Sequence, residues 1–157
     1  IRAHTDYLYK KISLKTHIFY AENVLNDVFH LIAGYAELRK VKFFKRYEAN
    51  ASIYLDKILF YQACLQIIRF LCDHTENGDS IFAIIGRTED NLVLNFQNNG
   101  LVLSEELLQS LNDPSFFSAN LDLNFAKKII SEHGGTMFAE YNSEKRMCIK
   151  LMLPIVK

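Results

Sequence analysis

The sequence predicts a mixed α/β domain in which helices cover one face of a β-sheet, and three observations predict it. Segments with helical spacing of apolar residues alternate with short runs rich in β-branched and aromatic residues. Half of the 157 residues are apolar, which is enough for one sizeable core. No repeat, low-complexity tract or Pro/Gly linker divides the chain. Stacking the helices on one face of the sheet is the natural way to bury both kinds of element.

The predicted helices follow from apolar spacing and from their end signals. Val24, Val28 and Ile32 recur at helical spacing in the first long helix, and Asp56 is a good N-cap for the second. Gly134 and Gly135 form a strong C-terminal stop for the last helix. The helices expected in order are Arg2 to Lys11, Ala21 to Leu38, 57 to about 74, Glu105 to Leu111, and Leu121 to Glu132.

The predicted strands lie between these helices. Two pairs of runs are separated by short polar turns, so each pair is expected to form a hairpin. The strands expected in order are His17 to Phe19, Val41 to Tyr47, Ser52 to Leu55, Ser80 to Arg87, Asn91 to Gln97, Thr136 to Tyr141, and Met147 to Leu153.

Charge and cysteine content narrow the class of protein. The formal net charge is zero, so no strong field steers the chain toward nucleic acid or an anionic membrane. Cys64, Cys72 and Cys148 lie in apolar runs without ligand spacing, which favours buried free thiols in a reducing cytoplasm over a disulfide or metal site. No signal-peptide pattern and no apolar run long enough to span a bilayer appear in these residues. We therefore expect a cytoplasmic location, no nucleic-acid partner and no direct membrane contact from this segment.

Two further patterns have a functional and a structural interpretation. The basic run of residues 39–46 includes Phe43 and Phe44, as a nucleic-acid patch would, but outward charges on an exposed strand explain it better. None of the five histidines has ligand spacing or is followed by an acidic residue, so none is expected to be a phosphoacceptor.

Four segments, in order, carry a family resemblance. DKILFYQACLQIIRFLCDHT resembles, without gaps, the N-box helix of histidine kinases. The residues in matching places are Asp56, Gln62, Leu65, His74 and Thr75. LNFQNNGLVL resembles the first glycine box, LDLNFAKKIISEHGG the second with its helix, and CIKLMLP the closing strand. The chain thus resembles the histidine kinase-like (GHKL-type) ATPase domain from about 19 to 154.

The resemblance implies a Bergerat fold, which is a two-layer α/β sandwich with a mixed, mainly antiparallel sheet. It also implies that residues 17–157 form the ATPase-like domain. Residues 1–16 would be the end of an upstream helix, for which a dimerisation helix is one interpretation. The chain begins at Ile1, so we expect it to be a fragment of a longer protein.

Several residues at the family's nucleotide-binding positions are replaced. Phe70 stands where an N-box asparagine holds Mg²⁺, and its ring cannot coordinate a cation. Asn98 replaces the aspartate that accepts from the adenine amino group, and it accepts without charge. Gly100 is retained, but Val102 replaces the next glycine. Phe70 either faces the vestigial pocket, as the ungapped helical phase favours, or extends the core.

The second glycine box is replaced as well. Its three glycines correspond to Ser118, Asn120 and Asp122, and the late glycine box falls on Glu144 and Arg146. A carboxylate at position 122 would compete with a phosphate for the helix N-terminus, or it would simply cap that helix. Each lost charge-assisted contact is worth about 1.5–3 kcal/mol. Losing three or four would weaken ATP binding by about four orders of magnitude.

These replacements predict a non-catalytic pseudo-ATPase domain of a two-component signalling protein, with no cofactor, no metal and no catalytic residue. It would bind a response-regulator receiver domain or a partner kinase, or stabilise a homodimer built by upstream helices. Three alternatives remain at this point. The chain could belong to a histidine phosphotransferase with a vestigial ATPase domain, be an active kinase with a divergent ATP site, or have an unrelated binding fold.

Overall fold

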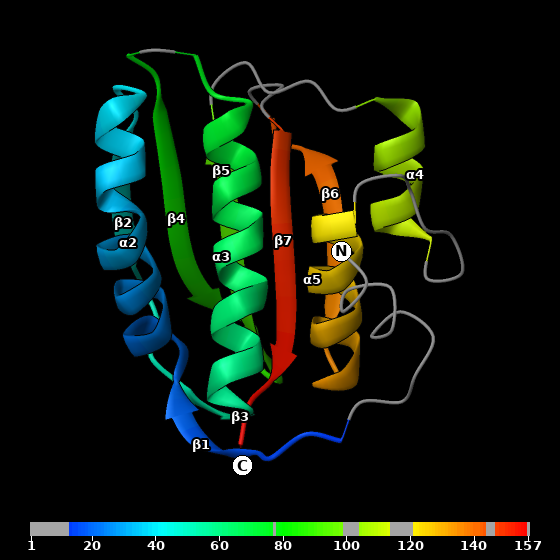
Figure 1. Cartoon of the computed structure of the whole chain (residues 1–157). Coiled ribbons are helices and arrows are strands. Elements are labelled where there is room, and N and C mark those ends of the chain that lie inside the picture. The colour runs from blue at the N-terminus through cyan, green and yellow to red at the C-terminus, as the bar shows by residue number, and fades with distance from the viewer. Residues whose placement is uncertain (1–12, 77, 99–103, 114–120, 144–146, 157) are drawn as a thin grey trace.

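The computed structural model describes residues 13–76, 78–98, 104–113, 121–143 and 147–156. In these residues the chain forms strands and helices that are mixed along its length (Figure 1). The elements are β1 (His17–Tyr20), α2 (Ala21–Leu38), β2 (Lys42–Tyr47), β3 (Ser52–Leu55), α3 (Lys57–Asp73), β4 (Ser80–Arg87), β5 (Asn91–Asn98), α4 (Glu105–Asn112), α5 (Leu121–Glu132), β6 (Thr136–Tyr141) and β7 (Met147–Pro154). The helix expected from Arg2 to Lys11 lies outside the described residues.

The main sheet has five strands in the order β2-β4-β5-β7-β6. Its β2–β4 pair is parallel, and the other three pairs are antiparallel. The short strands β1 and β3 form a separate antiparallel pair, in which Ile18 lies opposite Tyr54. The mixed, mainly antiparallel sheet predicted from the sequence is confirmed.

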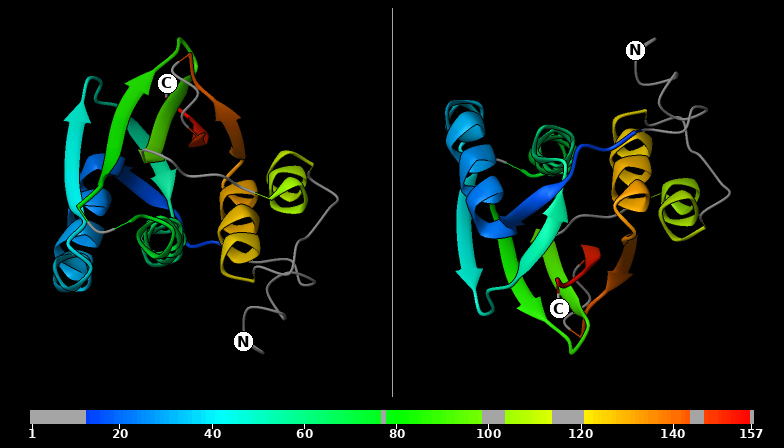
Figure 2. Two further views of the ribbon diagram at one scale, coloured as in Figure 1. Left: turned by 90° about the horizontal axis from the view of Figure 1, so that it is seen from above. Right: turned by 90° about the horizontal axis from the view of Figure 1, so that it is seen from below.

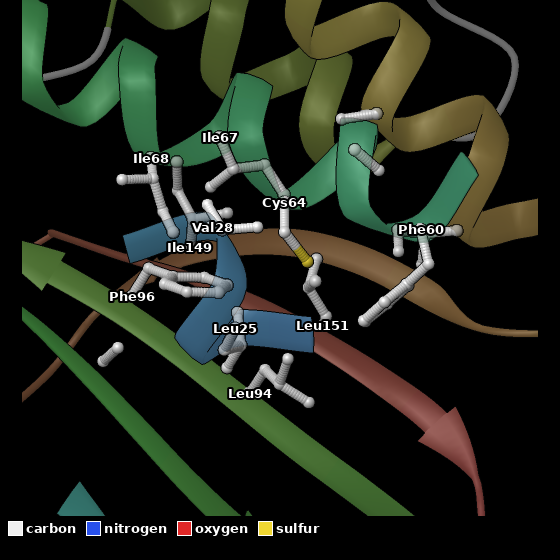
Figure 3. Packing of buried hydrophobic residues seen from close by; sticks show 14 of the residues in the cluster. Leu25, Val28, Phe60, Cys64, Ile67, Ile68, Leu94, Phe96, Ile149 and Leu151 are labelled. Atoms are coloured by element: carbon white, nitrogen blue, oxygen red, sulfur yellow. The ribbon is translucent and has the colours of Figure 1, made fainter. Parts of the chain in front are cut away.

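The helices α2, α3 and α5 lie side by side on one face of this sheet, and α4 stands beside β6 (Figures 1 and 2). Strand residues alternate accordingly, as in β5, where every second side chain from Leu92 is buried. Figure 3 shows the junction of the layers, where Cys64 and Ile68 of α3 point toward Phe96 of β5 and Leu151 of β7. These four side chains are fully buried. The two-layer sandwich is therefore held by one continuous apolar core.

The predicted helix ends are also confirmed. The Asp56 side chain accepts a hydrogen bond from the Leu59 amide at 3.2 Å, and Ser104 accepts one from Leu107 at 3.2 Å. After α5 the chain turns at Gly134, whose φ of +73° suits a residue without a Cβ. These ends fix where α3 and α5 begin or stop against the sheet.

The three cysteines are buried, as predicted. Burial raises the pKa of the Cys72 thiol to about 11 and also raises the pKa of the Cys64 and Cys148 thiols. Thiols held in this protonated form are poor nucleophiles. No helix among the described residues has the length and hydropathy needed to cross a membrane.

Candidate functional site

The C-terminal end of α3 meets the end of β5, and one hydrogen-bonded chain of side chains joins them. The Thr75 hydroxyl donates to the Leu71 carbonyl one turn earlier, at 2.5 Å. The Asn98 Nδ2 in turn donates to the Thr75 Oγ1 at 2.6 Å. Both side chains are buried, and Asn98 has no exposed surface. The fold thus brings the end of the predicted N-box helix onto the start of the predicted first glycine box.

This chain of bonds fixes the orientation of the Asn98 amide. The single hydroxyl proton of Thr75 is used on Leu71, so its oxygen must accept, and only the Nδ2 of Asn98 can donate to it. The Asn98 Oδ1 therefore faces away from Thr75, and it has no hydrogen-bond partner among the described residues. A buried amide oxygen without a partner costs free energy, so the site holds an acceptor ready for an N–H or O–H donor.

Phe70 lies one turn before this junction, on the same helix. Its ring is 6% exposed and belongs to the core cluster. It lies against the His74 ring, with 4.2 Å between the ring centroids and 34° between the planes. The His74 Nδ1 is 2.8 Å from the Phe70 carbonyl oxygen, which holds the imidazole in place as the donor of that bond. An apolar ring thus occupies the position at which the family's magnesium-binding amide is expected.

The remaining predicted site residues are located only in part. Gly100, Val102, Ser118 and Asn120 lie outside the described residues. Asp122 is the second residue of α5, so it belongs to the first helical turn. Whether its carboxylate caps the helix or would oppose a phosphate stays a prediction, because residues 114–120 lie outside the described residues.

Two contacts that hold the candidate site together were not predicted. The pairing of Thr75 with Asn98 joins residues 23 positions apart, and only the match of Thr75 to the family pattern pointed to it. At the other end of α3, the Asp56 amide donates to the His133 Nε2 at 3.0 Å, while the His133 Nδ1 lies 2.8 Å from the Ile129 carbonyl. This histidine ties the start of α3 to the end of α5, so the two helices are fixed relative to each other. The described residues contain no group of three or more His, Cys, Asp or Glu that could hold a metal ion.

The fold is that of histidine kinase catalytic domains. The catalytic domain of histidine kinase ThkA superposes with a TM-score of 0.79 at 18% identity, over 90% of this chain and 98% of that one. Acinetobacter baumannii histidine kinase AdeS gives a TM-score of 0.79 at 15% identity, over 99% of this chain and 75% of that one.

A third solved structure is histidine kinase ThkA in complex with the response regulator protein TrrA. It gives a TM-score of 0.82 at 19% identity, over 99% of this chain and 46% of the kinase chain. No protein-family model matches the sequence, and no curated protein matches it. At these identities the comparisons establish the histidine kinase-like ATPase fold, which the sequence motifs predicted.

Proposed function

We propose that this chain is a pseudo-ATPase domain of a two-component signalling protein and that it acts by binding other proteins. The observation that carries the proposal is the buried ring of Phe70 at the predicted magnesium-binding position of α3. A phenyl ring offers no lone pair to Mg²⁺ and no hydrogen bond to a phosphate oxygen. Mg²⁺-dependent phosphoryl transfer therefore lacks one of its ligands here.

The partner we propose is a response-regulator receiver domain, with a partner kinase as the alternative. Support comes from the fold, since one structure with this fold is a histidine kinase bound to a response regulator protein. A domain that keeps its scaffold after losing its nucleotide chemistry can still present the surfaces that such a partner contacts.

The direct test is calorimetric titration of the 157-residue chain with ATP and Mg²⁺. We expect no saturable heat at ligand concentrations up to the millimolar range. A dissociation constant below about 100 μM, which corresponds to more than about 5 kcal/mol of binding free energy, would contradict the proposal.

A second candidate, an active kinase with a divergent ATP site, is favoured by one specific observation. The Asn98 Oδ1 is a buried acceptor without a partner among the described residues, and the exocyclic amine of a purine could donate to it. Titration with ATP in the presence and absence of Mg²⁺ separates the candidates. Binding that does not depend on Mg²⁺ and disappears in Asn98→Ala would indicate a nucleotide-binding domain without metal chemistry, whereas Mg²⁺-dependent binding would indicate the active kinase.

The matched control for this substitution is Thr75→Val. It removes the hydrogen-bond partner of the Asn98 Nδ2 but leaves the Oδ1 in the site. Loss of nucleotide binding in Asn98→Ala alone would assign the contact to the amide oxygen. Equal loss in both variants would assign it to the general order of this junction.

A further inference from the structure

The outer side of α2 has an apolar stripe that the fold of the single chain does not use. Leu31 and Leu38 are 59% and 87% exposed and lie seven residues apart, or two helical turns. Asp27 and Gly34 complete a 4-3-4 spacing with them, which places all four positions on one face of the helix. The buried residues of α2, such as Val28 and Ile32, lie on the side toward the sheet and α3. We call Asp27, Leu31, Gly34 and Leu38 the α2 outer stripe.

The place of α2 in the molecule leaves this stripe uncovered by the other described elements. Figures 1 and 2 show α2 at one end of the helix layer, beyond α3, with its outer side turned away from the sheet. All four residues of the α2 outer stripe are exposed.

Gly34 is the unusual member of the stripe. A glycine inside a helix destabilises it relative to alanine, because it loses more backbone freedom on folding. A Cβ built at this position would meet no atom within 4 Å, and its φ is not in the left-handed region. Nothing in the described part of the chain therefore requires a glycine here. A missing side chain on an exposed helix face does, however, let another helix approach closely.

We propose that the α2 outer stripe is a self-association surface, on which the α2 helices of two copies of this chain pack antiparallel. In the register that we infer, each Leu31 lies over the partner subunit's Gly34, and each Leu38 lies beside the partner subunit's Asp27. The large side chain of one copy then fills the space left by the glycine of the other. A parallel arrangement would instead place leucine on leucine and leave two glycines facing each other.

The charges of α2 favour a second copy in the antiparallel sense. Asp27 lies toward the N-terminal end of the stripe, whereas Lys40 comes two residues after the end of the helix, and both side chains are exposed. Antiparallel packing brings each Asp27 near the partner subunit's Lys40, which gives two symmetric ion pairs. It also sets the helix dipoles in opposition, which is favourable. In a parallel pair Asp27 would face Asp27, and like charges would repel.

The test is a charge exchange measured by sedimentation equilibrium on the 157-residue chain. Asp27→Lys and Lys40→Glu should each raise the dimer dissociation constant about tenfold, because two attractive contacts become repulsive. An equimolar mixture of the two variants should associate as strongly as the unchanged chain, since every contact between unlike copies is again attractive. The double variant Asp27→Lys, Lys40→Glu should also recover the original association.

Further variants separate the stripe from other surfaces. Gly34→Ala should raise the thermal unfolding midpoint of the chain while weakening association, which a purely structural role for Gly34 cannot do. Ile58→Lys is the matched control, because Ile58 is 70% exposed but belongs to α3 and not to the stripe, so its replacement should leave association unchanged. A monomer at all concentrations, or a dimer that the α2 variants leave unchanged, would overturn the proposal.

Discussion

At the scale of single residues, the junction of Thr75 and Asn98 is the part of the candidate site where we expect substitutions to be tolerated least. Every polar group there is buried, so any lost partner leaves a desolvated donor or acceptor behind. The Asn98 amide already holds one oxygen without a partner among the described residues. A buried acceptor of this kind destabilises the fold unless a donor reaches it.

We predict that Thr75→Val lowers the free energy of unfolding by about 1–3 kcal/mol, because the Asn98 Nδ2 loses its acceptor while it stays buried. Valine has nearly the same shape as threonine, so the change reports the hydroxyl. Thr75→Ser keeps the hydroxyl and should lose less than half as much. Urea unfolding monitored by circular dichroism measures both. Equal losses in the two variants would mean that the Thr75 methyl, and not its hydroxyl, stabilises the junction.

At the scale of elements, a side chain of α4 covers part of the outer edge of the sheet, at β6. Asn112, the last residue of α4, donates from Nδ2 to the Ala139 carbonyl at 3.1 Å and accepts from the Ala139 amide at 2.8 Å. Its side chain thus takes the place of a neighbouring strand at the outer edge of β6. Unpaired edges of this kind invite pairing with other chains, so the contact both anchors α4 and protects the edge.

Replacing Asn112 with alanine should therefore detach α4 from β6. We expect a loss of about 1–2 kcal/mol in unfolding free energy, because two backbone groups lose their partners. Hydrogen exchange of the Ala139 amide should become much faster, and NMR or mass spectrometry can follow it. Gln109→Ala, an exposed position on the same helix, serves as the control. Unchanged protection at Ala139 in Asn112→Ala would show that the sheet edge is covered by other means.

At the scale of the whole molecule, the turn from α5 into β6 passes close to β7 at Gly135. A Cβ at this position would lie 2.6 Å from the Met152 carbonyl oxygen and 2.8 Å from a Leu153 methyl group, both on β7. Because the nearest atom is backbone, a side chain cannot move aside to make room. The close approach of this turn to β7 thus depends on the absence of a side chain at Gly135.

Gly135→Ala should lower the unfolding free energy by about 1–3 kcal/mol, as expected when an added methyl group forces packed backbones apart. Gly86→Ala is the matched control, because a Cβ at Gly86 on β4 meets nothing within 4 Å and its φ is not positive. This control should be neutral or slightly stabilising, because alanine loses less backbone freedom on folding. Urea unfolding measures the stability of both variants. Equal unfolding midpoints for Gly135→Ala and Gly86→Ala would refute the close approach at Gly135.

The sequence alone determined the order of elements, the helix ends and the fold class. Those features depend on local patterns, such as the alternation in β5, the Asp56 cap and the glycines after α5, and short-range chemistry suffices to read them. The motif resemblance also predicted that Phe70, Asn98 and Asp122 stand at nucleotide-binding positions of the family. The loss of ATP chemistry inferred from them remains a prediction.

Only the tertiary structure decided which side chains meet. The bonds between Thr75 and Asn98, Asp56 and His133, and Asn112 and Ala139 join distant parts of the chain, and no local pattern encodes such pairs. The same holds for the exposure of Leu31 and Leu38 on the outer side of α2. Helical periodicity gives the face on which a residue lies, but what covers that face depends on how the whole chain packs.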